Sequence, residues 1–550
     1  IIGSLLGREA LRMLLRIIAA LCCCSLALSQ IADWGWEDTT PLDEYVARPE
    51  PVYSYRLLST VRYDAINEGV EDCTVHILNM TSQTWQNSEV TSVSVWSHHL
   101  AIVIPAVSES GILHSCEVTS VSVWSHHLAI VIPDSVRIWD ASFMFIGGGR
   151  QTDAPPDPET DVFLDAVAEV AVRMGSAGAY LKQIPNQPMN LYQSNRPEMR
   201  RTEDALIAWT WRHWIETNQS DPTMVLQFPM VKSAKMAFDT IFSYTKSVNP
   251  QFNIDKFMPA GGSKRGWITW LIGCVDRRVV AMSPMVLSIL NMVETLGHHY
   301  RAYGGWSFAF MPYWNENVTQ HLYHPNTQTL ANLIDPFSYR RRMTMPKVVV
   351  QATADEFFRP DEPNFWFNQL VGPKYLKLMR NAQHALVGSY DNIIDSLVAM
   401  YKAMDENQPL PDFRWELTQG TETGRTTVYT NTQPQAVRAW YAQSADGEFG
   451  AERRDFRWFV RSSEDPNEVD LNLVLWDEST DVVEVVPGQE YYVEFNRPAT
   501  GWLGFFIELE FVLNNSEASV FEVTTELNVV PNTWPFPFCT SPEECTGRIV

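Results

Sequence analysis

The chain has 550 residues, 45% of them hydrophobic, and a formal net charge of −24 at pH 7. This length allows two domains with substantial cores. Its 20 Trp and 26 Phe argue against a disordered chain. The acidic balance disfavours nucleic acids and anionic membranes as partners.

The N-terminal segment, residues 1–29, is expected to be a secretory signal peptide with its start at Met13. Arg16 precedes an apolar run over residues 17–28, which ends at small residues suited to a signal peptidase. A membrane anchor is the alternative, but the run is short for a membrane span. We therefore expect a secreted protein, with no stable membrane span in the mature chain.

Cysteines and glycosylation motifs fit an extracellular chain. Cys539 and Cys545 lie six residues apart in a Pro-rich tail, residues 531–550, and are expected to form a disulfide. Five cysteines follow the leader, so at least one is left as a free thiol or bridges to another chain. Four N-x-S/T motifs predict glycosylation, at Asn79, Asn218, Asn317 and Asn514.

One segment occurs twice without a single change. The sequence EVTSVSVWSHHLAIVIP stands at residues 89–105 and again at 117–133. Its β-branched residues and apolar end are typical of a strand. Since one copy fills one place in a sheet, the other copy must be displaced, added at an edge or left exposed.

Strands and helices alternate over residues 45–405, which predicts a mostly parallel sheet with helices on both faces. Expected helices cover residues 161–174, 202–216 and 230–248, and expected strands cover 253–259, 279–286 and 347–352. After a boundary at about 403–412, short strands alternate with turns. Residues 409–530 are therefore predicted to form a separate C-terminal β-sandwich domain.

The central chemical signal is MPAGGSKRGWITW, residues 258–270. A strand, a glycine turn, Ser263 and a helix follow one another, as the nucleophile elbow of an α/β-hydrolase requires. Arg265 stands where a second glycine is expected, and Gly266 comes one residue later. The alternative is a serine that caps a helix.

Two further residues complete a catalytic set. Asp355 follows the strand KVVVQA, and His384 follows another strand-like run, so each lies just beyond a predicted strand. The order Ser263, Asp355, His384 is the order of α/β-hydrolases. Glu356 and Asp361 are rival acids, with solvated loop carboxylates as their alternative reading.

The oxyanion hole needs two N–H groups beside the nucleophile. Lys264, the residue after the serine, is expected to supply one. Gly147 and Gly148 in FIGGGR, after a predicted strand, are expected to supply the other, unless this is a plain glycine turn.

An aromatic segment within residues 290–330 is expected to cap the pocket. Tyr303, Trp306 and Tyr313 are candidates to line it, although each aromatic is individually more typical of a core. An exopeptidase would also need carboxylates to hold a substrate amine, and Asp335, Glu294 and Glu316 are candidates by location alone. Adjacent His pairs occur without a metal-ligand pattern, so neither a metal nor another cofactor is expected.

The chain resembles the PhoPQ-activated pathogenicity-related protein family. The resemblance covers roughly residues 45–525 and rests on WSHHLAIVIP, FIGGG, AGGSKRGWITW, IDPFSYRRRMTMPKVVVQATADEFF, NAQHAL and GWLGFFIELEF. It implies an α/β-hydrolase core, a C-terminal β domain and a triad of Ser263, Asp355 and His384. It also implies relatives that act as secreted, growth-restraining signals with dipeptidyl-peptidase-like activity.

Three functions are compatible with these features. The first is a secreted serine hydrolase that acts on a small peptide or ester. The second is an autocrine signalling or binding protein that uses the fold as a scaffold and binds a cell-surface receptor. The third is a glycoprotein with vestigial chemistry.

Overall fold

The computed structural model describes residues 31–66, 72–86, 90–91, 95–98, 100–101, 128–217, 221–447, 450–465, 467–513 and 520–550. The expected signal peptide, Cys116, Asn218 and Asn514 lie outside these ranges. No helix among the described residues is long and apolar enough to cross a membrane.

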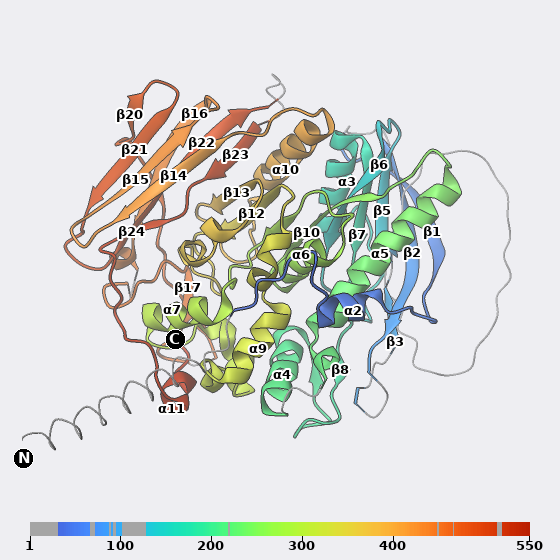
Figure 1. Cartoon of the computed structure of the whole chain (residues 1–550), viewed down its shortest axis with the longest axis horizontal. Coiled ribbons are helices and arrows are strands. Elements are labelled where there is room, and N and C mark those ends of the chain that lie inside the picture. Colours follow the sequence, from blue (N-terminus) through green and yellow to red (C-terminus); the bar gives the residue numbers. More distant parts are fainter. Residues whose placement is uncertain are drawn as a thin grey trace, which may run out of the picture.

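A large mixed sheet forms the centre of the molecule (Figure 1). Its first part runs in the order β1 (Ser54–Tyr63), β2 (Cys73–Thr84), β5 (Leu128–Pro133), β7 (Ser176–Leu181), β6 (Ile138–Ile146), β10 (Lys256–Gly262), β11 (Ser283–Met285), β12 (Lys347–Ala352) and β13 (Lys374–Met379). The strands from β7 to β13 are parallel. Parallel strands of this kind are apolar throughout because helices cover both of their faces.

The helices lie on both faces of this sheet. They are α2 (Pro41–Ala47), α3 (Val162–Met174), α5 (Gln227–Val248), α6 (Lys264–Val275) and α10 (Tyr390–Asp405). Phe143 on β6 packs against Tyr401 on α10, whereas Phe257 on β10 stacks on Phe238 on α5. Phe257 is in register with Ser142, the residue beside Phe143. Since neighbouring residues of a strand face opposite ways, α10 and α5 cover opposite faces.

Helix boundaries follow capping chemistry. The Asp161 side chain accepts hydrogen bonds from the first backbone N–H groups of α3, and Gly175 ends the helix in the left-handed conformation. The predicted helix over 161–174 is thereby confirmed. The predicted helix over 202–216 is also confirmed, as α4 (Glu203–Glu216).

The duplicated segment forms one composite strand beside β2. Copy one supplies β3 (Val95–His98) and β4 (Leu100–Ala101), and copy two supplies β5. His98 pairs with Met80, Ala101 with Ile77 and Ile130 with His76, so the antiparallel register runs on from one copy to the other. The start of the strand thus comes from copy one and its end from copy two.

The two copies also share two pairing positions on β7, since Ala101 and Ala129 both pair with Tyr180. Leu100 and Leu128 are equivalent residues of the two copies, and both have Leu181 on β7 as their pairing partner. The sequence predicts that one copy fills this place while the other is displaced, added at an edge or left exposed. The structure differs, because both copies contribute residues that pair with β2.

The cap expected at about 290–330 is mostly helical. It contains α7 (Met292–Tyr303), α8 (Met311–Asn315) and α9 (Pro325–Ile334), with short 3-10 turns at Phe308–Phe310 and Thr319–His321. Both α8 and α9 pack against α4, and together these helices form the lower part of Figure 1. The segment joins β11 to β12.

The C-terminal strands form two layers. One layer contains β14 (Phe413–Gln419), β15 (Thr423–Thr430), β21 (Glu490–Asn496) and β20 (Val483–Val486). The other contains β23 (Val520–Thr524), β22 (Leu503–Val512), β16 (Ala436–Gln443) and β19 (Asp477–Ser479), with β24 (Asn528–Val530) beside β22. Phe413 packs on Phe511 and Phe495 on Phe505, which gives the layers a sandwich core.

This sandwich differs from the independent domain expected over 409–530. Leu376 on β13 pairs with Thr524 on β23, so one layer continues the central sheet (Figure 1). Buried Lys377 also donates to the carboxylate of Glu522 at 3.0 Å. Strand composition alone cannot reveal this addition, because the pairing depends on an edge that only the folded sheet presents.

The tail over 531–550 packs on the cap. Cys539 and Cys545 are joined in a disulfide, and Cys545 belongs to the short helix α11 (Pro542–Thr546). The Trp306 indole N–H donates to the carbonyl of Cys545 at 2.9 Å, and the backbone of Trp306 bridges to Ile549. The tail therefore braces a residue that lines the pocket described below.

Candidate active site

Ser263 lies in the sharp turn between β10 and α6. Its φ of 56° and ψ of −128° are unusual for a residue with a side chain. The backbone N–H of Ser263 donates to the carbonyl of Met285 at 2.9 Å, which fixes the turn against β11. Strain of this kind at a strand-to-helix turn is what exposes the side chain in a nucleophile elbow.

The glycine pattern around Ser263 follows from close backbone packing. A Cβ on Gly266 would lie 2.7 Å from the Met285 carbonyl oxygen, so this position admits only glycine. The preceding position, Arg265, has room for a long side chain. Its guanidinium pairs with Glu203 at 2.7 Å and donates to the Ile184 carbonyl. The departure from the usual glycine spacing is thus accommodated locally.

Asp355 and His384 lie together beside this turn. His384 Nδ1 is 2.9 Å from Asp355 Oδ1 and 2.8 Å from Oδ2. The carboxylate is buried, and it also accepts the backbone N–H groups of Phe357 and Phe358. A carboxylate held in this way orients the imidazole and leaves its other nitrogen free to accept a proton.

The two rival acids have other partners. Glu356 accepts the backbone N–H of His384 at 3.0 Å and does not contact its imidazole. Burial, with the nearby Asp355 charge, raises the pKa of Glu356. Asp361 is paired with Arg359 and Arg454. Asp355 is therefore the carboxylate that contacts the ring.

Ser263 and His384 line the same cavity, which has a volume of about 540 Å³. Within the described chain no hydrogen bond joins the Ser263 hydroxyl to the imidazole. Catalytic hydrogen bonds are commonly long without a substrate and tighten when one binds.

The glycine loop after β6 and the start of α6 hold the candidate oxyanion donors. The Gly147 N–H donates to the Leu181 carbonyl at 2.8 Å, so it is already used within the fold. Gly148 and Gly149 follow it on the wall of the cavity that holds Ser263. Lys264 is the first residue of α6, where backbone N–H groups have no partner within the helix. Gly148 and Lys264 therefore suit an oxyanion better than Gly147 does.

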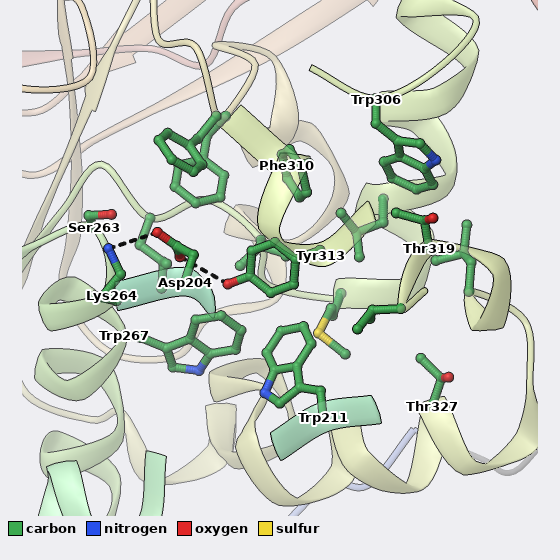
Figure 2. Close-up of a pocket in the computed structure, with 18 of the residues that line it drawn as sticks. Asp204, Trp211, Ser263, Lys264, Trp267, Trp306, Phe310, Tyr313, Thr319 and Thr327 are labelled. Atoms are coloured by element: carbon green, nitrogen blue, oxygen red, sulfur yellow. Dashed lines mark hydrogen bonds and ion pairs between the residues drawn. The ribbon is translucent and has the colours of Figure 1, made fainter. Parts of the chain in front are cut away.

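A second, much smaller pocket lies on the cap side of Ser263 and has a volume of about 50 Å³ (Figure 2). Asp204 on α4 lies between two donors there. Lys264 Nζ is 3.0 Å from one Asp204 oxygen, and the Tyr313 hydroxyl donates to the other at 3.0 Å. Trp211 and Trp267 form part of the apolar wall.

Glu203 adds a second carboxylate to this cluster. Lys264 Nζ lies 3.0 Å from Glu203 Oε2, and Arg265 pairs with the other oxygen. Burial alone would raise the pKa of Glu203, but Arg265 and Lys264 outweigh burial and hold the pKa well below its usual range. Two carboxylates and two cations thus balance beside Ser263.

Sequence reasoning missed this acidic pair. Glu203 and Asp204 open a helix, where acidic residues ordinarily complement the helix dipole, so nothing in their spacing indicated a site. The three carboxylates that were considered lie elsewhere. Glu316 pairs with Arg201 and Arg212, Glu294 with His298, and Asp335 accepts backbone N–H groups of Met292 and Phe337.

Two of the three aromatic candidates line the small pocket, and the third does not. Trp306 and Tyr313 line the small pocket, as expected (Figure 2). Tyr303 is not among the lining residues that the described chain provides. It is buried instead under the guanidinium of Arg457, 4.1 Å from the ring centroid. A helix turns successive residues to different sides, so Tyr303, the first of the three candidates, faces Arg457 in the C-terminal region.

Of the two glycosylation motifs that the structure describes, one is buried and the other is exposed. Asn79 lies inside β2, pairs with Arg56 on β1 and is buried, so a glycan there would not fit the folded sheet. Asn317 is exposed between α8 and the following 3-10 turn.

The sheet order, the strained serine turn and the Asp–His pair define a protein of the α/β-hydrolase class, with extra β-sheet at its C-terminus. The profile of the PhoPQ-activated pathogenicity-related proteins matches residues 42–117 and 110–457. The chain belongs to this family. It is 32% identical over 517 residues to autocrine proliferation repressor protein A of Dictyostelium discoideum. This alignment covers 92% of this chain and 94% of that protein.

Solved structures give more distant likenesses. An acetyl xylan esterase from Paenibacillus sp. R4 shares 12% identity and a TM-score of 0.42, covering 67% of this chain and 97% of the esterase. Acetyl xylan esterase 1 from Thermoanaerobacterium shares 11% identity and a TM-score of 0.40, covering 68% and 96%.

Proposed function

We propose that the protein is a secreted serine hydrolase that transfers the acyl group of a neutral ester or amide to water. The observation that carries this proposal is the strained Ser263, which opens on the same cavity as an imidazole bound to a buried carboxylate. Secretion rests on the signal-like segment at residues 1–29 and on the tail disulfide.

The residues have distinct roles in this reaction. Ser263 Oγ attacks the carbonyl carbon while His384 Nε2 takes its proton and then gives it to the leaving group. Asp355 holds the ring in the required tautomer and stabilises the imidazolium. The N–H groups of Lys264 and Gly148 stabilise the oxyanion. Water, activated by His384, then releases the acid and restores Ser263.

The charges near the serine favour neutral substrates. An exopeptidase must hold a free substrate amine, and Asp204 is the carboxylate that lines the small pocket. Lys264 and Tyr313 already bind both of its oxygens. A substrate amine would have to displace Lys264, whereas an ester needs no such exchange. A dipeptidyl-peptidase-like reaction is thus the less favoured form of the proposal.

A fluorophosphonate probe tests the nucleophile directly. The secreted protein is expected to be labelled, and Ser263→Ala is expected to abolish labelling, whereas Ser247→Ala on the exposed side of α5 leaves it intact. The absence of labelling from folded wild-type protein would refute the hydrolase. Hydrolysis of p-nitrophenyl butyrate, compared with a dipeptide p-nitroanilide, separates the ester from the exopeptidase form.

The second candidate is an autocrine signal that acts through a cell-surface receptor. Its support is the 32% identity to a protein named as an autocrine proliferation repressor. Deleting residues 409–550 would not test it, since β23 pairs with the central sheet and the tail braces the cap. Ser263→Ala is the sharper test. If this variant still restrains cell proliferation, signalling is independent of hydrolysis.

A further inference from the structure

We infer that the cavity of about 540 Å³ beside Ser263 binds a large apolar group, aliphatic or aromatic, attached directly to the scissile ester or amide. The inference rests on the proposed hydrolase function and names the substrate class of that site. A cavity of this size is in the range of sites for small organic ligands.

The cavity lies between the sheet and the helix pair α3 and α10. Its floor is formed by buried apolar side chains from three elements: Phe143 and Ile146 on β6, Val167 and Val170 on α3, and Ile394 and Leu397 on α10. These side chains offer no hydrogen-bonding groups. A polar substrate portion placed here would lose its hydrogen bonds to water without replacement, so the floor selects against it.

Aromatic rings form one wall. Phe145 stacks on Phe163 with ring centroids 5.2 Å apart, and Phe163 packs on Tyr390 at 6.0 Å. The Phe163 side chain is 36% exposed although it belongs to this cluster. An apolar group that enters the cavity would cover the ring and remove that surface from water.

The charged side chains Asp161, Lys182 and Arg265 line the cavity and are half-buried, which places them toward its mouth, and each has an ion-pair partner. Lys182 Nζ bonds Asp161 at 2.7 Å, and Arg265 is held by Glu203. Ser263 and His384 also line the cavity and are half-buried, which places them toward the same mouth. The reacting carbonyl would therefore sit at the polar entrance, with the apolar group directed inward.

The opposite side of Ser263 has little space. The cap-side pocket has a volume of about 50 Å³, which is closer to a methyl group than to a chain. The two spaces flank one serine, so the substrate is expected to be asymmetric. One side of the scissile bond is large and apolar, and the other is small.

The expected signature is a steep dependence on chain length. Each methylene that moves from water into the cavity increases kcat/KM by up to about fourfold, the equivalent of about 0.8 kcal/mol. The rise continues until the cavity is full. The same logic applies to whichever side of the ester occupies the cavity.

Two ester series measure this dependence on the full chain. One varies the acyl group of methyl esters from acetate to octanoate, so that the other side of the scissile bond stays small. The other varies the alcohol of acetate esters from methyl to benzyl. A rise in kcat/KM along either series supports the inference and identifies the side that enters the cavity. Flat profiles in both series overturn it, while continued fluorophosphonate labelling would leave the hydrolase proposal standing.

A substitution that fills the cavity tests the same inference, with a control substitution on the same helix. Ala166 lines the cavity from α3 and is half-buried, so Ala166→Trp places an indole in the space. The ratio of octanoate to acetate kcat/KM is expected to fall about tenfold, the equivalent of roughly two lost methylenes. Val162→Trp, on the exposed start of the same helix, is expected to leave the ratio unchanged. An equal fall with both substrates contradicts the inference.

Binding without turnover gives an independent readout. On Ser263→Ala, the fluorescence of 1-anilinonaphthalene-8-sulfonate is expected to increase and octanoate is expected to displace the dye. Saturable displacement that Ala166→Trp weakens supports the cavity even if wild-type protein proves inactive. If octanoate displaces the dye equally well from the Ser263→Ala variant and from the Ser263→Ala/Ala166→Trp double variant, the inference is overturned.

Discussion

His384 Nδ1 lies within hydrogen-bond distance of both carboxylate oxygens of Asp355, at 2.9 and 2.8 Å. Asp355→Asn keeps the size of the side chain but favours the wrong tautomer of the ring. We expect kcat/KM on p-nitrophenyl butyrate to fall about 10³–10⁴-fold. Glu356→Gln is the matched control, because the Glu356 carboxylate accepts the backbone N–H of His384, whereas Asp355 contacts the ring. Equal losses in both variants would remove Asp355 from its proposed role.

Gly266→Ala tests the close packing behind the serine turn. The new Cβ would lie 2.7 Å from the Met285 carbonyl oxygen, so β11 and α6 must separate. We expect a loss of about 1–3 kcal/mol in the free energy of unfolding, together with weaker fluorophosphonate labelling. Gly262→Ala controls for the loss of backbone freedom, since its Cβ would meet nothing nearer than 3.8 Å. Denaturant unfolding with equal midpoints for the two variants would contradict this account.

Lys347 makes the free energy of unfolding depend on pH in the alkaline range. Its buried ammonium donates to the carbonyls of Val371 and Pro373. Burial, with the charge of Lys374, lowers the pKa of Lys347 to about 7. The unfolded chain, with a lysine pKa of about 10.4, therefore binds more protons between these values, and the free energy of unfolding rises with pH across that window by about 4 kcal/mol.

The test compares two lysine variants by denaturant unfolding between pH 7 and 10. Lys347→Met is expected to lose most of this rise, and Lys246→Met on the exposed end of α5 is expected to keep it. A wild-type stability that stays level or falls over this range would show that the Lys347 ammonium is not destabilised by burial.

The composite strand predicts the effect of removing the duplication. Deleting residues 100–127 joins His99 to Leu128 and restores one uninterrupted copy in the register that β2 already fixes. We expect an increase of about 1–3 kcal/mol in unfolding free energy, because a long insertion no longer has to be closed. Thermal unfolding and soluble yield measure this. Deleting only residues 106–116 leaves both copies and should give no such gain; a less stable 100–127 deletion would refute the composite strand.

Much of the fold could be predicted from local patterns. The strand Lys347–Ala352 has the bounds that its β-branched run predicts, and α3 starts where Asp161 caps it. The addition of β23 to β13 could not be predicted, because it joins residues that are far apart in the sequence and carry no matching signal. Pairing across a sheet edge is decided by the shape of the folded neighbours.

The site shows the same division. Ser263, Asp355 and His384 could be predicted because each follows a strand and their order is informative. Gly147 could not be separated from Gly148 without knowing that its N–H is taken by Leu181. Asp204 also escaped prediction, since its contacts with Lys264 and Tyr313 depend on how α4 meets the cap.

The perfection of the repeat has a genetic consequence. Excising residues 89–116, 100–127 or 106–133 yields the same amino-acid sequence, because the two copies are identical. The residues that pair with β2 come from both copies, and because the copies are identical, the sequence does not reveal where the additional 28 residues were inserted. Any in-frame deletion of 28 residues that begins between residues 89 and 106 would produce the same 522-residue protein. Selection acting on the protein could not distinguish between these deletions.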